Sequence, residues 1–104
     1  EDIETYHVDF LSLNITFYNH HRGTFSTPLT YDDIPMPVAE FDNGALRAAI
    51  MDSQQNGQPF HEFCIHAAEA GVQSYFVFLT GRRVLYLGRS GDTHIEWFPA
   101  PEPA

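Results

Sequence analysis

Apolar runs and polar turns follow one another through the last third of the chain, over residues 71–98. Three short runs rich in β-branched and aromatic residues, at 74–80, 84–88 and 93–98, are separated by two turns that contain glycine. This pattern is typical of antiparallel strands joined by hairpins. The stretch therefore predicts a three-stranded meander, and its first run, apolar at 75–79, predicts an interior strand.

The beginning of the chain shows the same periodicity. Residues 5–11 alternate as in a half-buried strand, and residues 13–18 have the pattern of its hairpin partner. A third short run, 24–26, follows a polar turn. Residues 27–40 contain three prolines, which predict a surface crossing without regular structure.

Two short helices are predicted between these two regions. Asp42 is a plausible N-cap for the first helix, and Gly57 supplies its C-terminal stop. Pro59 suits the first position of the second helix, and Gly71 ends it. Their expected buried faces are Leu46, Ala49, Ile50 and Ser53 in the first helix, and Phe60, Phe63, Cys64 and Ala67 in the second.

These elements predict an α+β fold. We expect one domain over residues 1–98, with an antiparallel sheet of five or six strands and both helices packed on one face. A chain of this length has room for a single modest core. Residues 99–104, with three prolines, are expected to form a flexible tail.

Residues 3–18 align without a gap with residues 72–87, at an offset of 69. We interpret this as a possible internal duplication of a strand pair. The counterpart of the helix at 60–70 would then precede residue 1, so that the chain would begin part-way through its first unit. The matched pairs are Ile3 with Val72, Thr5 with Ser74, Tyr6 with Tyr75, Val8 with Val77, Phe10 with Leu79, Ile15 with Val84, and Phe17 with Tyr86.

Most of the chain also resembles a small bacterial and prophage family known as domain of unknown function 1398, often labelled "phage envelope protein". The resemblance implies the same fold, with an extra helix before the first strand, and a bacterial or phage origin. It implies no activity, so no site residue is transferred. The segments that carry it are Glu4-x-Tyr6-His7-Val8-Asp9, the helix from Phe41-Asp42 to Gln55, Tyr75-Phe76-Val77-Phe78-Leu79-Thr80-Gly81-Arg82-Arg83-Val84, and Gly88-Arg89-x-Gly91-Asp92-x-His94-x-Glu96-x-Phe98-Pro99.

The charge balance limits the possible partners. Fourteen carboxylates and five basic residues give a formal net charge of −9. Such a protein is a poor non-specific binder of nucleic acid or of an anionic membrane. Its single cysteine, Cys64, excludes an internal disulfide and favours a cytoplasmic location. We expect Cys64 to be a core residue of its helix.

Two groups of residues are candidates for ligand binding. Arg82, Arg83 and Arg89 lie within eight residues, beside two turns, and arginine forks match phosphates and carboxylates. The alternative is that they are solvated hairpin ends that pair with the protein's own acids.

His7 and Asp9 share one face of their strand, as His94 and Glu96 share one face of theirs. These four residues would form an acid–base or metal cluster if the two strands met. A polar outer face is the alternative interpretation. His20-His21 is expected to be a polar turn, and no motif specifies a cofactor or a metal, so we predict neither.

Two helices can cover only one face of a sheet this wide. We expect the opposite face to carry Phe76, Phe78, Leu85 and Leu87 beside the four polar residues named above. A patch this apolar is rarely left open on a monomer. We expect a preceding helix, a second copy, a partner protein or a ligand to cover it.

The sequence therefore favours a small accessory binding protein, without an assigned reaction. It would engage a protein partner or a small anionic ligand through the arginine-bearing turns and the outer sheet face, and it is a possible homodimer. Two alternatives stay open. One is a small enzyme that uses a His–carboxylate pair on an anionic substrate, and the other is an acidic phage inhibitor of a basic host protein.

Overall fold

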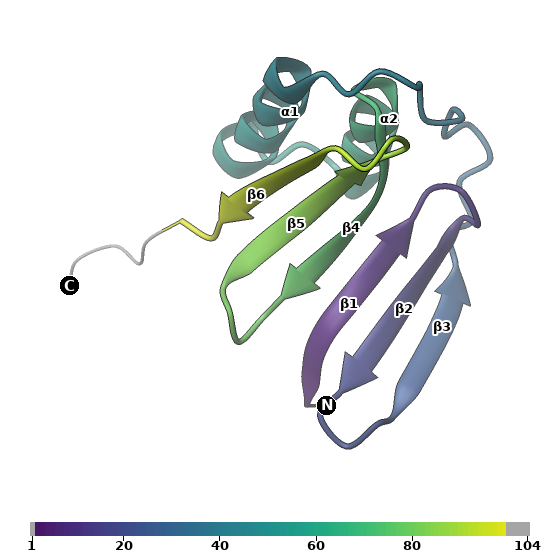
Figure 1. Cartoon of the computed structure of the whole chain (residues 1–104), viewed down its shortest axis with the longest axis vertical. Coiled ribbons are helices and arrows are strands. Elements are labelled where there is room, and N and C mark those ends of the chain that lie inside the picture. Colours follow the sequence, from purple (N-terminus) through teal and green to yellow (C-terminus); the bar gives the residue numbers. More distant parts are fainter. Residues whose placement is uncertain (1, 100–104) are drawn as a thin grey trace.

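A computed structural model describes residues 2–99, which form one sheet with two helices (Figure 1). This confirms the predicted α+β class, with six strands. The predicted tail lies, apart from Pro99, outside the described residues. The elements in chain order are β1 (Ile3–Asp9), β2 (Asn14–Asn19), β3 (Thr24–Pro28), α1 (Asn43–Asn56), α2 (Phe60–Glu69), β4 (Val72–Phe78), β5 (Arg83–Gly88) and β6 (Thr93–Trp97).

The strand order across the sheet is β3-β2-β1-β4-β5-β6, and every neighbouring pair is antiparallel. The predicted interior strand is therefore one of the two central strands. β1 ends at Asp9, earlier than expected, because the Asp9 carboxylate accepts the backbone N–H of Leu11 at 2.8 Å and closes the turn. β4 begins two residues earlier than predicted, at the fully buried Val72, which pairs with Gly88.

The structure shows the internal repeat that the alignment predicted. β1, β2 and β3 each correspond to the strand that lies 69 residues later, with the same bounds. The irregularities also repeat: the ladder shifts register between Ile3 and Thr5 and again between Val72 and Ser74. We call residues 3–28 repeat 1 and residues 72–97 repeat 2.

The two repeats are related by an approximate two-fold axis through the middle of the sheet. His7 pairs with Phe76 across the β1–β4 ladder, and these two residues occupy the same position in their repeats. Backbone hydrogen bonds on either side are symmetric: Phe10 N donates to Gln73 O, and Leu79 N donates to Glu4 O. The central pairing thus joins two copies of one three-stranded unit.

The helices begin and end as the sequence predicted, with one difference. Asp42 caps α1, and its carboxylate accepts the backbone N–H of Ala45 at 3.0 Å. Gly57 ends α1 in the left-handed conformation, at φ 66°. Pro59 is the N-cap of α2 rather than its first helical residue, because its extended ψ of 148° places it before the first turn.

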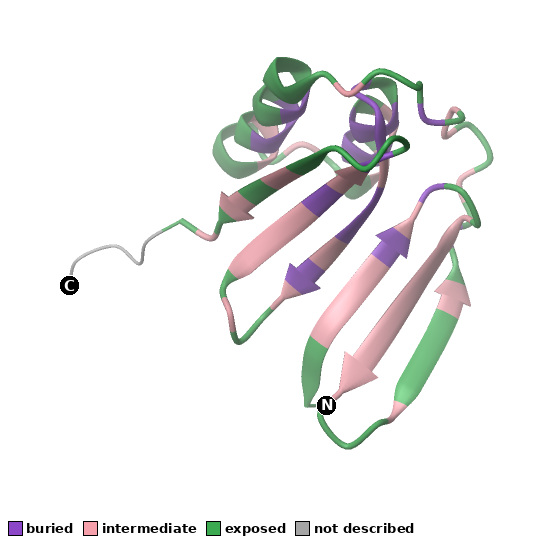
Figure 2. Ribbon diagram, viewed as in Figure 1, coloured by how far each residue is buried: buried purple, intermediate pink, exposed green. Residues whose placement is uncertain are grey.

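The core lies between the helices and the repeat 2 half of the sheet. Both helices lie beside β4, β5 and β6 in Figure 1, and buried residues concentrate there in Figure 2. Leu46 of α1 and Val72 of β4 are fully buried. No helix covers the same side of repeat 1 within the described residues, so Phe25 of β3 is 65% exposed. The helix layer therefore ends near the middle of the sheet.

Candidate functional site

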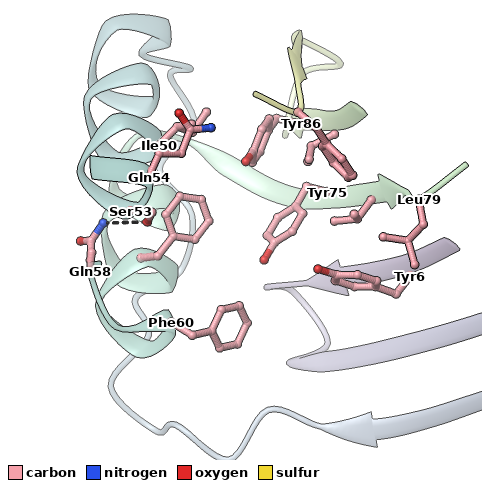
Figure 3. Close-up of a pocket in the computed structure, with 13 residues that line it drawn as sticks. Tyr6, Ile50, Ser53, Gln54, Gln58, Phe60, Tyr75, Leu79 and Tyr86 are labelled. Carbon is pink, nitrogen blue, oxygen red and sulfur yellow. Dashed lines mark hydrogen bonds between the residues drawn. The ribbon is translucent and has the colours of Figure 1, made fainter. Parts of the chain in front are cut away.

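A pocket of about 400 Å³ lies where the helix layer meets the middle of the sheet (Figure 3). α1 and α2 supply one wall, and β1, β4 and β5 supply the other. The lining residues are Tyr6, Ile50, Ser53, Gln54, Gln58, Phe60, Phe63, Tyr75, Val77, Leu79, Val84, Tyr86 and Phe98. None of them carries a charged side chain.

Three tyrosines form the sheet wall of this pocket. Tyr6, Tyr75 and Tyr86 extend from neighbouring strands toward the helices, with their hydroxyl oxygens directed into the space between the layers (Figure 3). Tyr75 and Tyr86 pack against each other with ring centroids 5.2 Å apart, and Phe63 of α2 packs edge-on against Tyr75. The rings therefore form a stiff aromatic surface with polar ends.

Burial keeps these tyrosines neutral. It raises the pKa of Tyr6, and it raises the pKa of Tyr75 well above the ordinary value of 10.0. Burial also raises the pKa of Tyr86, with a smaller contribution from the nearby Glu96 carboxylate. At physiological pH each hydroxyl can therefore both donate and accept a hydrogen bond, and none supplies an anionic oxygen.

Amide and hydroxyl groups line the helix wall. Gln58 is fixed in place because its Nε2 donates to Ala49 O and to Ser53 Oγ, each at 3.1 Å. Its Oε1 lies 2.5 Å from His66 Nδ1. Gln54 lies in the last turn of α1, four residues before Gln58 in the connection between the helices, and it is exposed at the pocket edge. The two walls together offer neutral hydrogen-bonding groups around an apolar interior.

This pocket was not predicted from the sequence, because the three tyrosines have the pattern of ordinary strand residues that face a core. A usable signal was present, since a buried tyrosine must direct its hydroxyl toward a polar partner or an open space. Tyr6 and Tyr75 were already matched in the repeat alignment, which places them close to the central axis. Where the helix layer ends was not visible from the sequence.

The three candidate arginines do not converge on one site. Arg82 lies over the Phe98 ring at 5.6 Å, and Arg83 lies over the Trp97 ring at 4.1 Å. Arg89 follows the other end of β5, where its Nη1 donates to Pro37 O at 3.0 Å. The turns that hold them lie at opposite ends of one strand, so their spacing in sequence did not predict proximity.

The two His–carboxylate pairs also lie apart, because β4 and β5 separate β1 from β6. The two pairs also lie on opposite faces of the sheet. Glu96 pairs with Val84 and lies on the helix side, whereas His7 pairs with Phe76 and lies on the outer side. The expectation that His94 and Glu96 share the outer face was wrong, because the phase of β6 was assigned without its pairing partner.

His94 and Glu96 do contact each other. His94 Nε2 donates to Glu96 Oε1 at 2.9 Å, and the Asn43 side-chain amide donates to His94 Nδ1 at 3.0 Å. Both ring nitrogens therefore have partners within the chain. This arrangement fixes α1 to β6 and leaves no free imidazole nitrogen for a substrate.

The outer face of the sheet carries the predicted apolar residues. Phe76 and Phe78 stack with ring centroids 6.0 Å apart, and Leu85 pairs with Phe76 across the β4–β5 ladder. β6 extends this surface with Ile95 and Trp97, which are 49% and 58% exposed. The sequence had not assigned these two residues to the patch.

His7 lies at the centre of the outer face, stacked on Phe76 with ring centroids 4.1 Å apart. Its Nε2 is buried and has no hydrogen-bond partner. Burial lowers the pKa of His7 from the ordinary value of 6.5, and the nearby Asp9 carboxylate only partly opposes this. His7 is therefore neutral at physiological pH.

We predict that His7 makes stability depend on pH. Since its pKa is lower in the folded protein, the unfolded chain takes up the proton first, so stability present above about pH 6.5 is lost as pH falls toward the folded pKa. Replacing His7 with Phe, as at the matched position 76, should therefore reduce the loss. Urea unfolding of both proteins at pH 7.5 and 5.0, at one low protein concentration, measures this. An equal loss in both proteins would contradict the prediction.

Two further groups of the described residues have side chains that could bind a metal or act as a nucleophile. Asp2, His20 and His21 are exposed, and their potential metal-ligating atoms lie within 4.8 Å of one another. That the protein holds no metal stays a prediction, and a metal found at this cluster would contradict it.

Cys64 is fully buried, which confirms its place in the core, and burial raises the pKa of its thiol to about 12. It is therefore not a reactive thiolate.

No family model matches the chain. Over 67 residues, which is 64% of the chain, it is 37% identical to Uncharacterized protein Mb2035 of Mycobacterium bovis and equally to Uncharacterized protein Rv2012 of Mycobacterium tuberculosis. The matched segment spans 41% of the length of those relatives. Among the described residues, no helix is long and apolar enough to cross a membrane.

Proposed function

We propose that the protein binds a neutral small molecule in the pocket between its helices and the middle of its sheet. One observation carries this proposal: three neutral tyrosine hydroxyls from neighbouring strands face a space of about 400 Å³. Ligand pockets are commonly 300–1,000 Å³ and combine apolar walls with a few converging polar groups.

The lining determines the class of ligand. The pocket offers no charged side chain, and burying an unpaired charge there would be costly. Aromatic and aliphatic side chains favour a flat ring system. Hydroxyls on one wall and the Gln54 side chain on the other favour amide, carbonyl or hydroxyl groups on the ligand. We therefore expect a one- or two-ring neutral compound with hydrogen-bonding substituents.

The test is a ligand-observed NMR screen of one- and two-ring neutral amides and lactams, each paired with the carboxylate of the same ring. We expect neutral members to bind, and their carboxylate partners to bind at least tenfold more weakly. A Tyr75→Phe variant should lose roughly 2- to 10-fold in affinity, as expected for one hydrogen bond. Equal binding of neutral and anionic compounds would contradict the proposal.

A matched pair of variants locates the site. Gln54→Trp adds a large side chain at the pocket edge, whereas Gln55→Trp adds the same side chain one residue further along α1, outside the lining. Both positions are exposed, so both variants should fold. Binding should be lost with Gln54→Trp and retained with Gln55→Trp. Retention in both would place the ligand elsewhere.

The other roles predicted from the sequence also stay proposals, and the structure supports some of them less than others. Separation of the three arginines weakens an anionic-ligand role, and the occupied nitrogens of His94 weaken an acid–base enzyme role. The apolar outer face supports a partner of some kind. An acidic inhibitor role depends on the net charge alone.

Origin and location are also proposals. A bacterial origin is supported by the mycobacterial relatives, and a prophage origin only by the resemblance noted above. A cytoplasmic location depends on the single buried thiol.

A further inference from the structure

The two repeats allow an internal comparison of their outer faces. Two residues that lie 69 positions apart occupy equivalent places in the two repeats. The backbone fold therefore does not require their side chains to differ. Yet the outer face of repeat 1 is mainly polar, whereas that of repeat 2 is mainly apolar. The matched pairs are Asp9 with Phe78, Thr16 with Leu85, Tyr18 with Leu87, and Ser26 with Ile95.

The apolar half is uncovered within the described chain. Both helices lie on the other side of the sheet, because the core residues that they bury, such as Tyr75 and Val77, alternate with Phe76 and Phe78. Exposed apolar surface of this kind, bordered by polar strands, is typical of an interaction site.

We infer that the outer face is covered by the outer face of a second copy of this chain, in a two-fold symmetric dimer. This inference is independent of the pocket, which opens on the helix side. It depends on the charge pattern of the face and on its area.

Charge is nearly absent from this face, although the chain has a net charge of −9. Among the paired strand residues, the charged side chains on the outer side are Asp9 and Arg83, since His7 is neutral. Two copies can therefore approach through this face without bringing their many carboxylates together.

Asp9 and Arg83 are also arranged symmetrically about Phe76. Asp9 pairs with Ser74, two residues before Phe76 in β4, and Arg83 pairs with Phe78, two residues after it. The two charges lie on opposite neighbouring strands, β1 and β5. A two-fold axis that lies in the face, passes over Phe76 and runs perpendicular to the line from Asp9 to Arg83 places Asp9 opposite Arg83 of the partner subunit, twice in each dimer. Such self-complementarity is what an isologous interface requires.

The area of the face is sufficient if both halves take part. Six strands about 4.8 Å apart and about 17 Å long cover roughly 500 Å² in projection. A dimer would therefore hide at most roughly 1,000 Å² in total, at the lower limit for a specific interface. The apolar half alone would hide about half of that, so the polar strands and their Asp9 must also be in contact.

The test is sedimentation equilibrium of the full chain at concentrations up to about 100 µM. We expect the wild-type protein to be dimeric at the upper end. Arg83→Glu places like charges opposite each other twice and should raise the dimer dissociation constant at least tenfold. Arg82→Glu makes the same charge change at the adjacent turn residue, whose side chain lies over the Phe98 ring, and should leave the dimer intact.

A second variant tests the apolar half without depending on charge. Leu85→Thr with Ile95→Ser introduces the residues that repeat 1 carries at matched positions, which the fold already accommodates there. This double variant should be monomeric, with a circular dichroism spectrum like that of the wild type. A wild-type monomer at 100 µM, or a dimer that withstands both Arg83→Glu and the double variant, would overturn the inference.

Discussion

Replacing Gly71 with Ala should destabilise the protein by more than about 4 kcal/mol, a large part of the roughly 5–15 kcal/mol by which an ordinary small domain is stable. Gly71 connects α2 to β4 at φ 96°, where an L side chain costs roughly 1–2 kcal/mol. A Cβ atom there would also overlap the backbone carbonyl of Glu40. The carbonyl cannot yield easily, because Asp42 N donates to Ala70 O at 2.7 Å and holds the two segments together.

The matched control for this variant is Gly91→Ala. Gly91 has φ 90°, but nothing lies within 4 Å of the added Cβ. Its counterpart in repeat 1 is Arg22, which adopts φ 70° with a full side chain. We therefore expect Gly91→Ala to cost only about 1–2 kcal/mol in urea unfolding. Equal costs for the two variants would show that the close approach to Glu40 is not important.

Replacing Leu46 with Ala should cost about 2–5 kcal/mol, the usual range for a buried leucine. Leu46 is the largest fully buried side chain, and it anchors α1, which forms part of the pocket wall. For a domain of this size the loss corresponds to a fall of roughly 10–30 °C in the melting temperature. Thermal unfolding followed by circular dichroism measures it.

Met51→Ala is the control in the same helix. Met51 is 49% exposed, so its truncation should change stability by less than about 1 kcal/mol. A small effect at Leu46, similar to that at Met51, would mean that α1 does not pack on the sheet as described.

Much of the fold could be predicted because its information is local. Strand alternation, the Asp42 cap and the Gly57 stop are all set by a few neighbouring residues, and the structure confirms them. The duplication was also visible, since it leaves matched residues at a constant offset. What the sequence could not supply was the pairing of strands from different repeats.

The errors at the candidate sites arose within one repeat, where the register and the direction of the strands had to be known. Assigning His94 and Glu96 to the outer face required knowing that Glu96 pairs with Val84. Grouping Arg89 with Arg82 required their turns to be at one end of β5, whereas they lie at opposite ends. The pocket was missed because it depends on where the helix layer ends over the sheet, which local patterns do not determine.

The proposed ligand site is tested most directly by NMR on protein labelled with ¹³C in its five tyrosine rings, during titration with the strongest neutral compound from the screen. We predict that the signals of Tyr6, Tyr75 and Tyr86 shift together. Tyr18 pairs with Thr5 on the outer face and should not respond. Binding that shifts Tyr18 alone, or that leaves all three pocket tyrosines unchanged, would contradict the proposed function.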